Sequence, residues 1–161
     1  EIYCDGGARG NPGPAACAAV IKNAKCKISN DKKCKSQVLE KVSKYLGPIL
    51  TNNQAEYLAV IEGLKAAKKY QPDKVTVFMD SELAVEQLNL RYKLKNKGLK
   101  EPFDEVMTLK LSFPVVEFKY IPREENKEAD RLVNKILNSK QKNLKTQNSN
   151  LKSTSQMSNL N

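Results

Sequence analysis

The side chains of this 161-residue chain that could do acid–base or metal chemistry are carboxylates, because the chain contains no histidine. That absence excludes Ser-His and Cys-His catalysis and any metal site built on imidazole. Four acidic residues stand at the ends of expected strands or on expected helices: Asp5, Glu56, Asp80 and Asp130. Carboxylates that meet in a fold suit proton transfer or the binding of hard cations.

Asp5 follows a short strand-like run, Ile2–Cys4, and precedes a segment rich in glycine and proline that extends to Pro14. Such a segment cannot continue a strand, so the chain must turn sharply. We therefore expect Asp5 at the carboxyl end of a strand, where open α/β sheets usually place their chemistry. Glycine there would let a phosphodiester backbone come close. The alternative is a surface aspartate in a plain hairpin.

Glu56 lies in the first turn of an expected helix that begins at Thr51 and ends near Lys69. The helix is predicted from apolar residues at helical spacing and from a Thr51–Gln54 capping box. Its first turn also carries three amide side chains: Asn52, Asn53 and Gln54. These amides could hydrogen-bond a sugar or phosphate edge. The alternative role of Glu56 is a favourable interaction with the helix dipole.

Asp80 ends a continuous β-rich run, Lys74–Met79, which is typical of a buried central strand. A helix over Glu82–Asn89 is expected to follow at once. Asp80 is therefore a second aspartate at a strand end. The alternative is that it caps the following helix.

The last expected helix, Lys127–Asn138, carries Asp130 beside its apolar stripe. A carboxylate at the edge of a buried face suits a cleft, and pairing with Asn134 is the ordinary alternative. From residue 139 the chain is mainly Asn, Ser, Gln, Lys and Thr, which cannot bury enough apolar surface to offset ordering. We therefore predict one domain over residues 1–138 and a disordered, polar, basic tail over residues 139–161.

The remaining elements follow from hydrophobic periodicity and from breaks at glycine and proline. Strands are expected at 15–22, 37–46 and 115–121, helices at 82–89 and 102–111, and an extended hairpin loop at 23–36. This order predicts an α/β fold with a five-stranded mixed sheet, made of a three-strand antiparallel meander plus two parallel strands and flanked by helices. Right-handed crossovers would bring the fourth and fifth strands beside the first.

The four acidic residues would then gather at one edge of the sheet. Four carboxylates so close repel one another at neutral pH, and divalent cations would relieve that repulsion. Oxygen-only ligands indicate Mg²⁺ or Mn²⁺ over zinc. Two such ions about 4 Å apart can activate a water and stabilise the leaving oxygen of a phosphodiester.

The charge balance favours a polyanionic partner. Lys and Arg number 28 against 18 acidic residues, for a formal net charge of +10. Nucleic acid is the first partner class that such a charge indicates, and an anionic membrane surface is the second. No apolar run approaches the roughly 20 residues that cross a bilayer, so we expect no membrane span.

The four cysteines form no C-x-x-C pair, and their spacing argues against a zinc site: Cys4, Cys17, Cys26 and Cys34. The sequence has no signal-peptide pattern, so we expect reduced thiols and a cytoplasmic protein. A Cys26–Cys34 disulfide stays open. The chain begins inside a strand without Met, and the sequence leaves open whether residues precede Glu1.

Four segments resemble type 1 ribonuclease H, in the order that the family has them: Asp5–Pro14, Thr51–Glu56, Asp80–Ser81 and Glu125–Asp130. Each segment is weakly specific, but together they are highly specific, and the resemblance covers roughly residues 1–137. It implies the five-stranded fold inferred above. It also implies hydrolysis of the RNA strand of RNA–DNA hybrids with two Mg²⁺ ions, leaving 5′-phosphate and 3′-hydroxyl ends.

The resemblance also implies roles for individual residues. The four carboxylates would be the catalytic metal ligands, with Asp5 bridging both ions. Asn11, Asn52 and Gln54 match positions that contact the hybrid in the minor groove, where 2′-hydroxyls distinguish RNA from DNA. Asn53 and Ser81 are further substrate-binding candidates. No obligate protein partner is implied, and we expect a monomer.

Two regions depart from the family pattern. Many members carry a histidine on a loop before the last aspartate, thought to help product release, whereas this chain has Ile121–Asn126 there. Our hypothesis is that Arg123 partly substitutes by contacting the scissile or product phosphate. Some relatives have a longer, Trp-containing basic protrusion where this chain has Leu90–Pro102, so the chain resembles the handle-less subgroup. Its affinity would then depend on Lys-rich segments and on salt.

Two other functions compete with the nuclease. One is a ribonuclease-H-like module that binds hybrids without cutting them, or a fragment of a larger polymerase-associated protein. The other is a basic structural protein whose carboxylates are helix caps and surface charges, which requires four coincidences of spacing. The sequence leaves open the cleavage preference, the choice between Mg²⁺ and Mn²⁺, and activity on double-stranded RNA.

Overall fold

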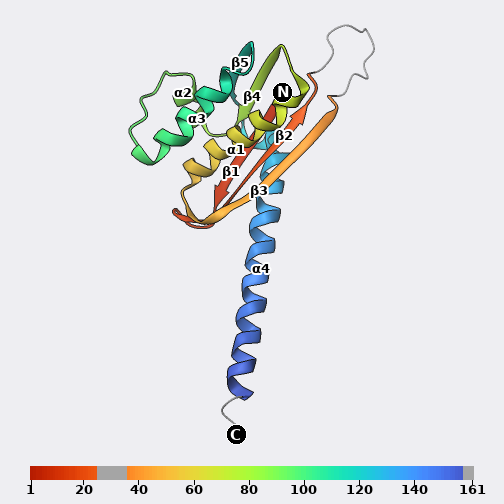
Figure 1. Ribbon diagram of the computed structural model, residues 1–161, viewed down its shortest axis with the longest axis vertical. Helices are drawn as coiled ribbons and strands as arrows, with labels where there is room; N and C mark the ends of the chain where they lie inside the picture. The colour runs from red at the N-terminus through yellow and green to blue at the C-terminus, as the bar shows by residue number, and fades with distance from the viewer. Residues whose placement is uncertain (25–35, 158–161) are drawn as a thin grey trace.

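A single mixed sheet forms the centre of the molecule (Figure 1). The computed structural model describes residues 1–24 and 36–157. Its five strands are β1 Ile2–Ala8, β2 Gly13–Lys22, β3 Val38–Leu50, β4 Lys74–Met79 and β5 Val115–Tyr120. Most of the loop predicted at 23–36, with Cys26 and Cys34, lies outside the described residues.

The strand order is β3-β2-β1-β4-β5. β1 pairs antiparallel with β2, and β2 pairs antiparallel with β3. β4 is parallel to both β1 and β5. The predicted fold class is therefore confirmed, with one difference in placement: β5 lies beside β4 and not beside β1.

Four α-helices accompany the sheet in the described part of the chain: α1 Asn52–Ala67, α2 Glu82–Leu88, α3 Lys100–Lys110 and α4 Lys127–Met157. Three short 3₁₀ turns precede or follow them: η1 Lys68–Tyr70, η2 Lys97–Leu99 and η3 Arg123–Glu125. The predicted capping box of α1 is present, because the Thr51 side chain accepts from the Gln54 N–H and the Gln54 side chain accepts from the Thr51 N–H. None of the described helices is long and apolar enough to cross a membrane.

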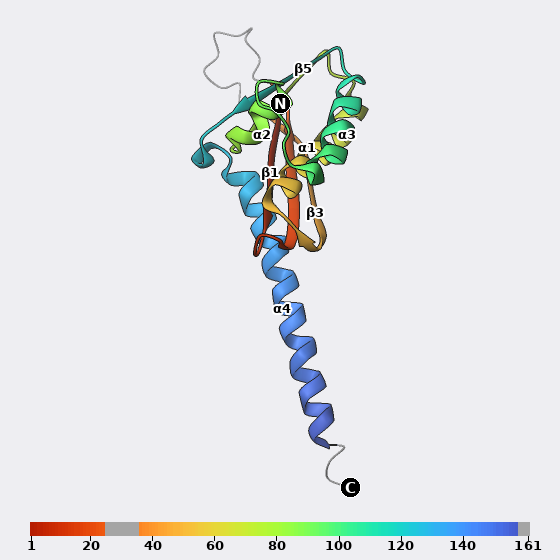
Figure 2. The ribbon, with the colours of Figure 1, turned by 90° about the vertical axis from the view of Figure 1, so that its left-hand side faces the viewer.

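β2 is buried on both faces because helices cover both sides of the sheet at this strand. Its small side chains alternate between two cores, as expected for a strand buried on both sides. Cys17 and Ala19 face the larger core, which α1, α2 and α3 complete, whereas Ala16 and Ala18 face a smaller core with Val133 and Leu137 of α4. Figure 2 shows α4 and α1 on opposite sides of the sheet. The small residues of β2 thus let elements pack closely on both faces of this strand.

Two strands run further than predicted, β1 and β3. β1 continues past Asp5 to Ala8 because its pairing with β2 persists as far as Ala8 and Ala15. Asp5 is therefore not at the end of that strand. β3 runs through Gly47 and Pro48 to Leu50, with Gly47 at φ 142°.

α4 is the largest difference, because it continues to Met157 where the sequence predicted an end at Asn138 and a disordered tail (Figure 1). Residues 139–157 contain no glycine or proline, so no residue there stops a helix that is already formed. The predicted helix end at Asn138 is thus wrong, and Ser158–Asn161 lie outside the described residues. The division into a domain over 1–138 and a tail stays a prediction.

Candidate active site

Asp5 and Asp80 are neighbours at the edge where the parallel strands diverge. The β1–β4 pairing ends with Cys4 opposite Met79, so the next residue along each strand is an aspartate. The two carboxylates interact electrostatically, as sequence reasoning expected of adjacent parallel strands. The Ser81 side chain, not that of Asp80, caps α2 by accepting from the Ala84 N–H at 3.4 Å. The N-cap alternative for Asp80 is therefore wrong.

Gly6 brings Glu56 to the same place. A Cβ on Gly6 would lie 2.1 Å from the Ala55 carbonyl carbon and 2.3 Å from the Glu56 nitrogen. Only a residue without a side chain lets the first turn of α1 rest on β1 this closely. The sequence suggested that glycine here admits a phosphodiester backbone, whereas in the structure Gly6 admits the helix that carries Glu56.

A polar pocket of about 360 Å³ collects all four predicted carboxylates. Its walls come from β1, α1, the end of β4, the η3 turn and α4. The side chains that could act on a substrate or cation are Asp5, Arg9, Asn52, Glu56, Asp80, Arg123, Asp130 and Asn134. Sequence reasoning named six of these eight and missed Arg9 as a site residue, while it considered Asn134 only as a partner of Asp130.

Burial and mutual repulsion change the protonation of two of these carboxyls. The pKa of Asp5 is raised to about 7, first by burial and then by the nearby charges of Asp80 and Asp130, while Arg123 opposes the rise. The pKa of Glu56 is also raised to about 7, mainly by burial, against a hydrogen bond from Ser81. Both carboxyls therefore tend to keep a proton near neutral pH unless a cation is close.

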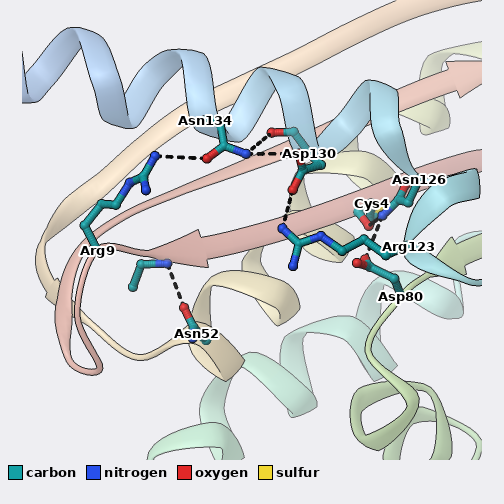
Figure 3. A network of polar contacts seen from close by, with 9 residues as sticks. Cys4, Arg9, Asn52, Asp80, Arg123, Asn126, Asp130 and Asn134 are labelled. Carbon is teal, nitrogen blue, oxygen red and sulfur yellow. Dashed lines mark hydrogen bonds and ion pairs between the residues drawn. The ribbon is translucent and has the colours of Figure 1, made fainter.

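Arg123 supplies a cation in this site. Its Nη2 donates to Oδ1 of Asp130 at 2.6 Å, and the Arg123 side chain is 75% exposed (Figure 3). The Asn134 amide donates to Oδ2 of the same carboxylate at 3.0 Å, so the ordinary i,i+4 alternative for Asp130 is also realised. The Asp130 carboxylate thus accepts one hydrogen bond from Asn134 on its own helix and one from Arg123 in the η3 turn.

Asn126 is a functional residue that sequence reasoning missed. It is buried, and its Nδ2 donates to the Cys4 carbonyl and to Oδ1 of Asp80, both at 2.8 Å (Figure 3). One side chain therefore ties β1, the end of β4 and the start of α4 together. The sequence signal was an uncharged amide directly before a helix inside a charged loop, a pattern that many surface residues share.

The predicted substrate-contacting amides are dispersed by the fold. Asn52 lines the pocket and accepts from the Ala8 N–H at 2.8 Å (Figure 3). Asn11 accepts from the Asn52 N–H at 3.2 Å. Gln54 serves the capping box of α1 and reaches the Gly98 carbonyl at 3.4 Å. Asn53 lines a different pocket, beside the basic connector before α3.

The side chains of the pocket supply the ligand atoms that hard cations prefer, but they are not arranged as a metal site. Within the described ranges, no group of three or more Asp, Glu or Cys side chains is arranged to hold a metal ion. The donor set is nevertheless all oxygen, and Oε2 of Glu56 is buried without a hydrogen-bond partner. An orphaned carboxylate oxygen beside two other acids fits a cation ligand.

Comparison with known protein families identifies the family of the chain that forms this pocket. The sequence model of a family described as "Reverse transcriptase-like" matches residues 3–136. The chain belongs to this family, within the ribonuclease H-like superfamily.

Relatives of this ribonuclease H-like chain include the bifunctional protein Rv2228c of Mycobacterium tuberculosis, which is 38% identical over 133 residues, covering 83% of this chain and 34% of that protein. The structure of the N-terminal RNase H domain of Rv2228c, fused to maltose binding protein, has a TM-score of 0.78 and 35% identity over 89% of this chain and 96% of that one. Ribonuclease HI of Halobacterium salinarum is 32% identical, over 85% of this chain and 63% of that protein.

A further solved structure, LC11-RNase H1 in complex with an RNA/DNA hybrid, has a TM-score of 0.71 and 41% identity over 83% of this chain and 93% of that one. The ribonuclease H-like chain thus spans 34% of the mycobacterial protein and 63% of the halobacterial one. The family match ends at residue 136, before the outer part of α4.

Proposed function

We propose that this protein is an endoribonuclease that hydrolyses the RNA strand of RNA–DNA hybrids by a two-metal-ion mechanism, leaving 5′-phosphate and 3′-hydroxyl ends. The observation that carries the proposal is the convergence of Asp5, Glu56, Asp80 and Asp130 from four separate elements on one pocket. Relatives named ribonuclease H, one of them solved with an RNA/DNA hybrid, support the substrate class.

The four carboxylates would hold two Mg²⁺ ions, or Mn²⁺ in their place. Such ions supply a water activated for attack and charge stabilisation at the leaving oxygen. Asp5 would be the central ligand of this set, since the charges of Asp80, Asp130 and Glu56 all raise its pKa. Asn126 is a positioning residue that orients the Asp80 carboxylate. We assign Arg123 to the scissile or product phosphate, which its exposed guanidinium could reach.

Substrate recognition would come from amides beside the pocket. Asn52 is the best supported of these, because it lines the pocket. Asn11 would act next to Asn52, and Gln54 two residues further along the first turn of α1, while Asn53 and Ser81 are assigned only peripheral contacts. Amide side chains can both donate to and accept from the 2′-hydroxyls that mark the RNA strand.

We also place the chain in the handle-less subgroup. The connector between α2 and α3 spans residues 89–99, contains no tryptophan and includes the short η2 turn. The same proposal makes the protein a monomer. Its location would be the cytoplasm, where the free, buried thiols of Cys4 and Cys17 would stay reduced.

The test is a labelled RNA–DNA hybrid with Mg²⁺, given to the wild-type protein and to Asp5→Asn, with single-stranded RNA and double-stranded DNA as control substrates. We expect the wild type to cut only the RNA of the hybrid and Asp5→Asn to bind without cutting. A wild-type protein that binds the hybrid and never cuts it would instead favour the non-cleaving module. Sequencing of the product ends checks the end chemistry.

A further inference from the structure

A chain of polar contacts runs from the β1–β2 turn to the carboxylate of Asp130. Arg9 Nη2 donates to the side-chain oxygen of Asn134 at 3.0 Å, and Asn134 Nδ2 donates to Oδ2 of Asp130, also at 3.0 Å (Figure 3). The same nitrogen of Asn134 donates to the Asp130 carbonyl. All three side chains line the candidate active site. The Asn134 amide therefore lies between a cation and a carboxylate.

The orientation of the Asn134 amide is fixed from both sides. An amide side chain has an acceptor oxygen and a donor nitrogen, and a half-turn of the group would exchange them. The oxygen would then face the Asp130 carboxylate, and the nitrogen would face the Arg9 guanidinium, so both contacts would become repulsive. Arg9 thus holds Asn134 in the orientation that donates to Asp130.

Helical spacing brings a second asparagine to Arg9. Asp130, Asn134 and Asn138 follow one another at intervals of four residues on α4, so they share one face of the helix. Arg9 Nη2 also donates to the side-chain oxygen of Asn138 at 3.0 Å. Both acceptors are uncharged, so neither of these contacts neutralises the guanidinium.

The backbone that carries Arg9 is anchored at its base. The Arg9 N–H donates to the Pro14 carbonyl at 2.8 Å, and a Cβ on Gly13 would lie only 2.3 Å from the Arg9 carbonyl oxygen. Beside it, the Ala8 N–H donates to Asn52 of α1. This end of the β1–β2 hairpin is therefore bonded to α1 through Ala8 and to α4 through Arg9. A side chain that starts from such a fixed base can hold its partner in place.

The two arginines of the pocket act on Asp130 in different ways. Arg123 pairs directly with Oδ1 of the carboxylate. Asn134 holds the other oxygen, Oδ2, and carries the effect of Arg9 to it through a neutral amide. A hydrogen bond polarised in this way is strengthened without a second cation against the carboxylate. Side chains that hold a metal ligand from behind typically change metal affinity by about 10- to 100-fold when they are removed.

We propose that Asn134 and Arg9 are positioning residues of this site: Asn134 holds the Asp130 carboxylate ready for a divalent cation, and Arg9 holds Asn134. The inference rests on the proposed function, because it takes Asp130 to be a cation ligand. It gives Arg9 an effect on cation binding that its charge alone would not produce. A positive charge near the site repels a cation, whereas an anchored Asn134 favours one.

The experiment measures the affinity of the full-length protein for Mg²⁺ without hybrid, by titration calorimetry, with Mn²⁺ as a second probe. Asn134→Leu removes the amide and should bind Mg²⁺ about tenfold more weakly than the wild type. Arg9→Met removes the guanidinium and should also weaken Mg²⁺ binding, by less than Asn134→Leu does. The double variant should bind Mg²⁺ as Asn134→Leu alone does, because members of one hydrogen-bond network do not act additively.

Lys135→Met is the matched control for the loss of charge, since Lys135 is exposed on α4 next to Asn134. Loss of a positive charge near the site should by itself leave Mg²⁺ binding unchanged or tighten it. Melting in the presence of a chelator checks that each variant is folded. If Asn134→Leu is not, Asn134→Ala takes its place, because Ala is the best helix former and also lacks the amide.

Hybrid cleavage provides a second readout. At low Mg²⁺ the turnover of Asn134→Leu should fall about tenfold, and saturating Mg²⁺ should restore most of kcat, with the KM for the hybrid unchanged. A loss of turnover that Mg²⁺ does not restore would show a general structural defect and count against the proposal.

Four results would overturn the proposal: wild-type Mg²⁺ affinity in Asn134→Leu, additive losses in the double variant, normal Mg²⁺ binding but weaker hybrid binding in Arg9→Met, or no binding of either cation by the wild type. If the wild type cuts hybrids and Asn134→Leu binds Mg²⁺ normally, only the positioning roles fail. If no hybrid is cut but the predicted losses of Mg²⁺ affinity are found, the nuclease assignment fails and the positioning roles stand.

Discussion

Asp5 and Glu56 are the residues whose protonation the fold changes most in the site. Burial, together with neighbouring acids, raises the pKa of both carboxyls to about 7. A protonated carboxyl is a poor cation ligand, so cation binding and proton release are linked at these two positions. Activity that needs both anions should therefore increase as the pH rises toward and through 7.

Replacing Asp5 by Asn tests this linkage through stability. The pKa of Asp5 in the folded protein, about 7, lies above its ordinary value of 3.8. The contribution of Asp5 to stability is therefore greatest below pH 4 and is lost as the pH rises from about 4 to about 7. Asn does not titrate, so the stability of Asp5→Asn relative to the wild type should increase across that window. Thermal unfolding in the presence of a chelator measures the difference.

Mg²⁺ provides the control for this experiment. At pH 7 and above, Mg²⁺ should raise the melting temperature of the wild type and have a smaller effect on Asp5→Asn, because the variant lacks the central anion. A stability difference that stays constant between pH 4 and 7 would contradict the raised pKa of Asp5.

Arg123 contributes to the metal-free site by balancing the charge of Asp130. Arg123→Ala should therefore lower the metal-free melting temperature and increase the stabilisation that Mg²⁺ provides, since Mg²⁺ no longer competes with the guanidinium for Asp130. Turnover should fall about tenfold to a hundredfold if the guanidinium also meets the phosphate. The exposed Arg131, on the next position of α4, offers Arg131→Ala as the matched control. Wild-type turnover of Arg123→Ala would refute the phosphate contact.

At the scale of elements, the contact between β1 and α1 positions the site. Gly6→Ala would place a Cβ 2.1 Å from backbone atoms of α1, whereas Gly7→Ala would meet Val133 Cγ1 at an ordinary 3.4 Å. We expect Gly6→Ala to destabilise the fold by about 2–4 kcal/mol and to reduce activity by displacing Glu56, and Gly7→Ala to be tolerated. Denaturant unfolding of both variants measures this, and equal stability of the two would contradict the close approach of helix and strand.

The elements themselves were predictable where local pattern and packing agree. α1 has both a capping box and a helical stripe, and β4 is a continuous β-rich run, so their bounds were predicted within about two residues. The end of α4 was not predicted, because the expectation relied on apolar content and the segment contains few apolar residues. Helix continuation there follows instead from the absence of a terminating residue.

At the scale of the whole molecule, the net charge of +10 should make hybrid binding depend strongly on salt. Lys93 and Lys95 on the connector before α3 are both exposed, beside a pocket that also contains Tyr92. Lys93→Gln with Lys95→Gln should reduce affinity and lower the slope of log affinity against log salt by about 0.9 for each phosphate that the variant no longer neutralises. Titration of a labelled hybrid at several salt concentrations checks the slope. An unchanged slope would exclude the connector from the interface.

The sequence by itself determined which residues could do the chemistry and which elements carry them. The absence of histidine, four carboxylates associated with expected strands or helices, and the strand and helix periodicities are local properties, so they can be read without a structure. They were sufficient to predict one mixed sheet with the acids of β1 and β4 on adjacent strands.

Only the tertiary structure decided how those acids are held. It showed that Gly6 accommodates a helix, that Asn126 fixes Asp80, that Arg123 pairs with Asp130, and that Arg9 reaches across to α4. The Asn126–Asp80 and Arg9–Asn134 bonds join residues 46 and 125 positions apart in the chain. Contacts at such separations arise from how helices pack on the two faces of the sheet, and no local pattern of residues specifies that packing.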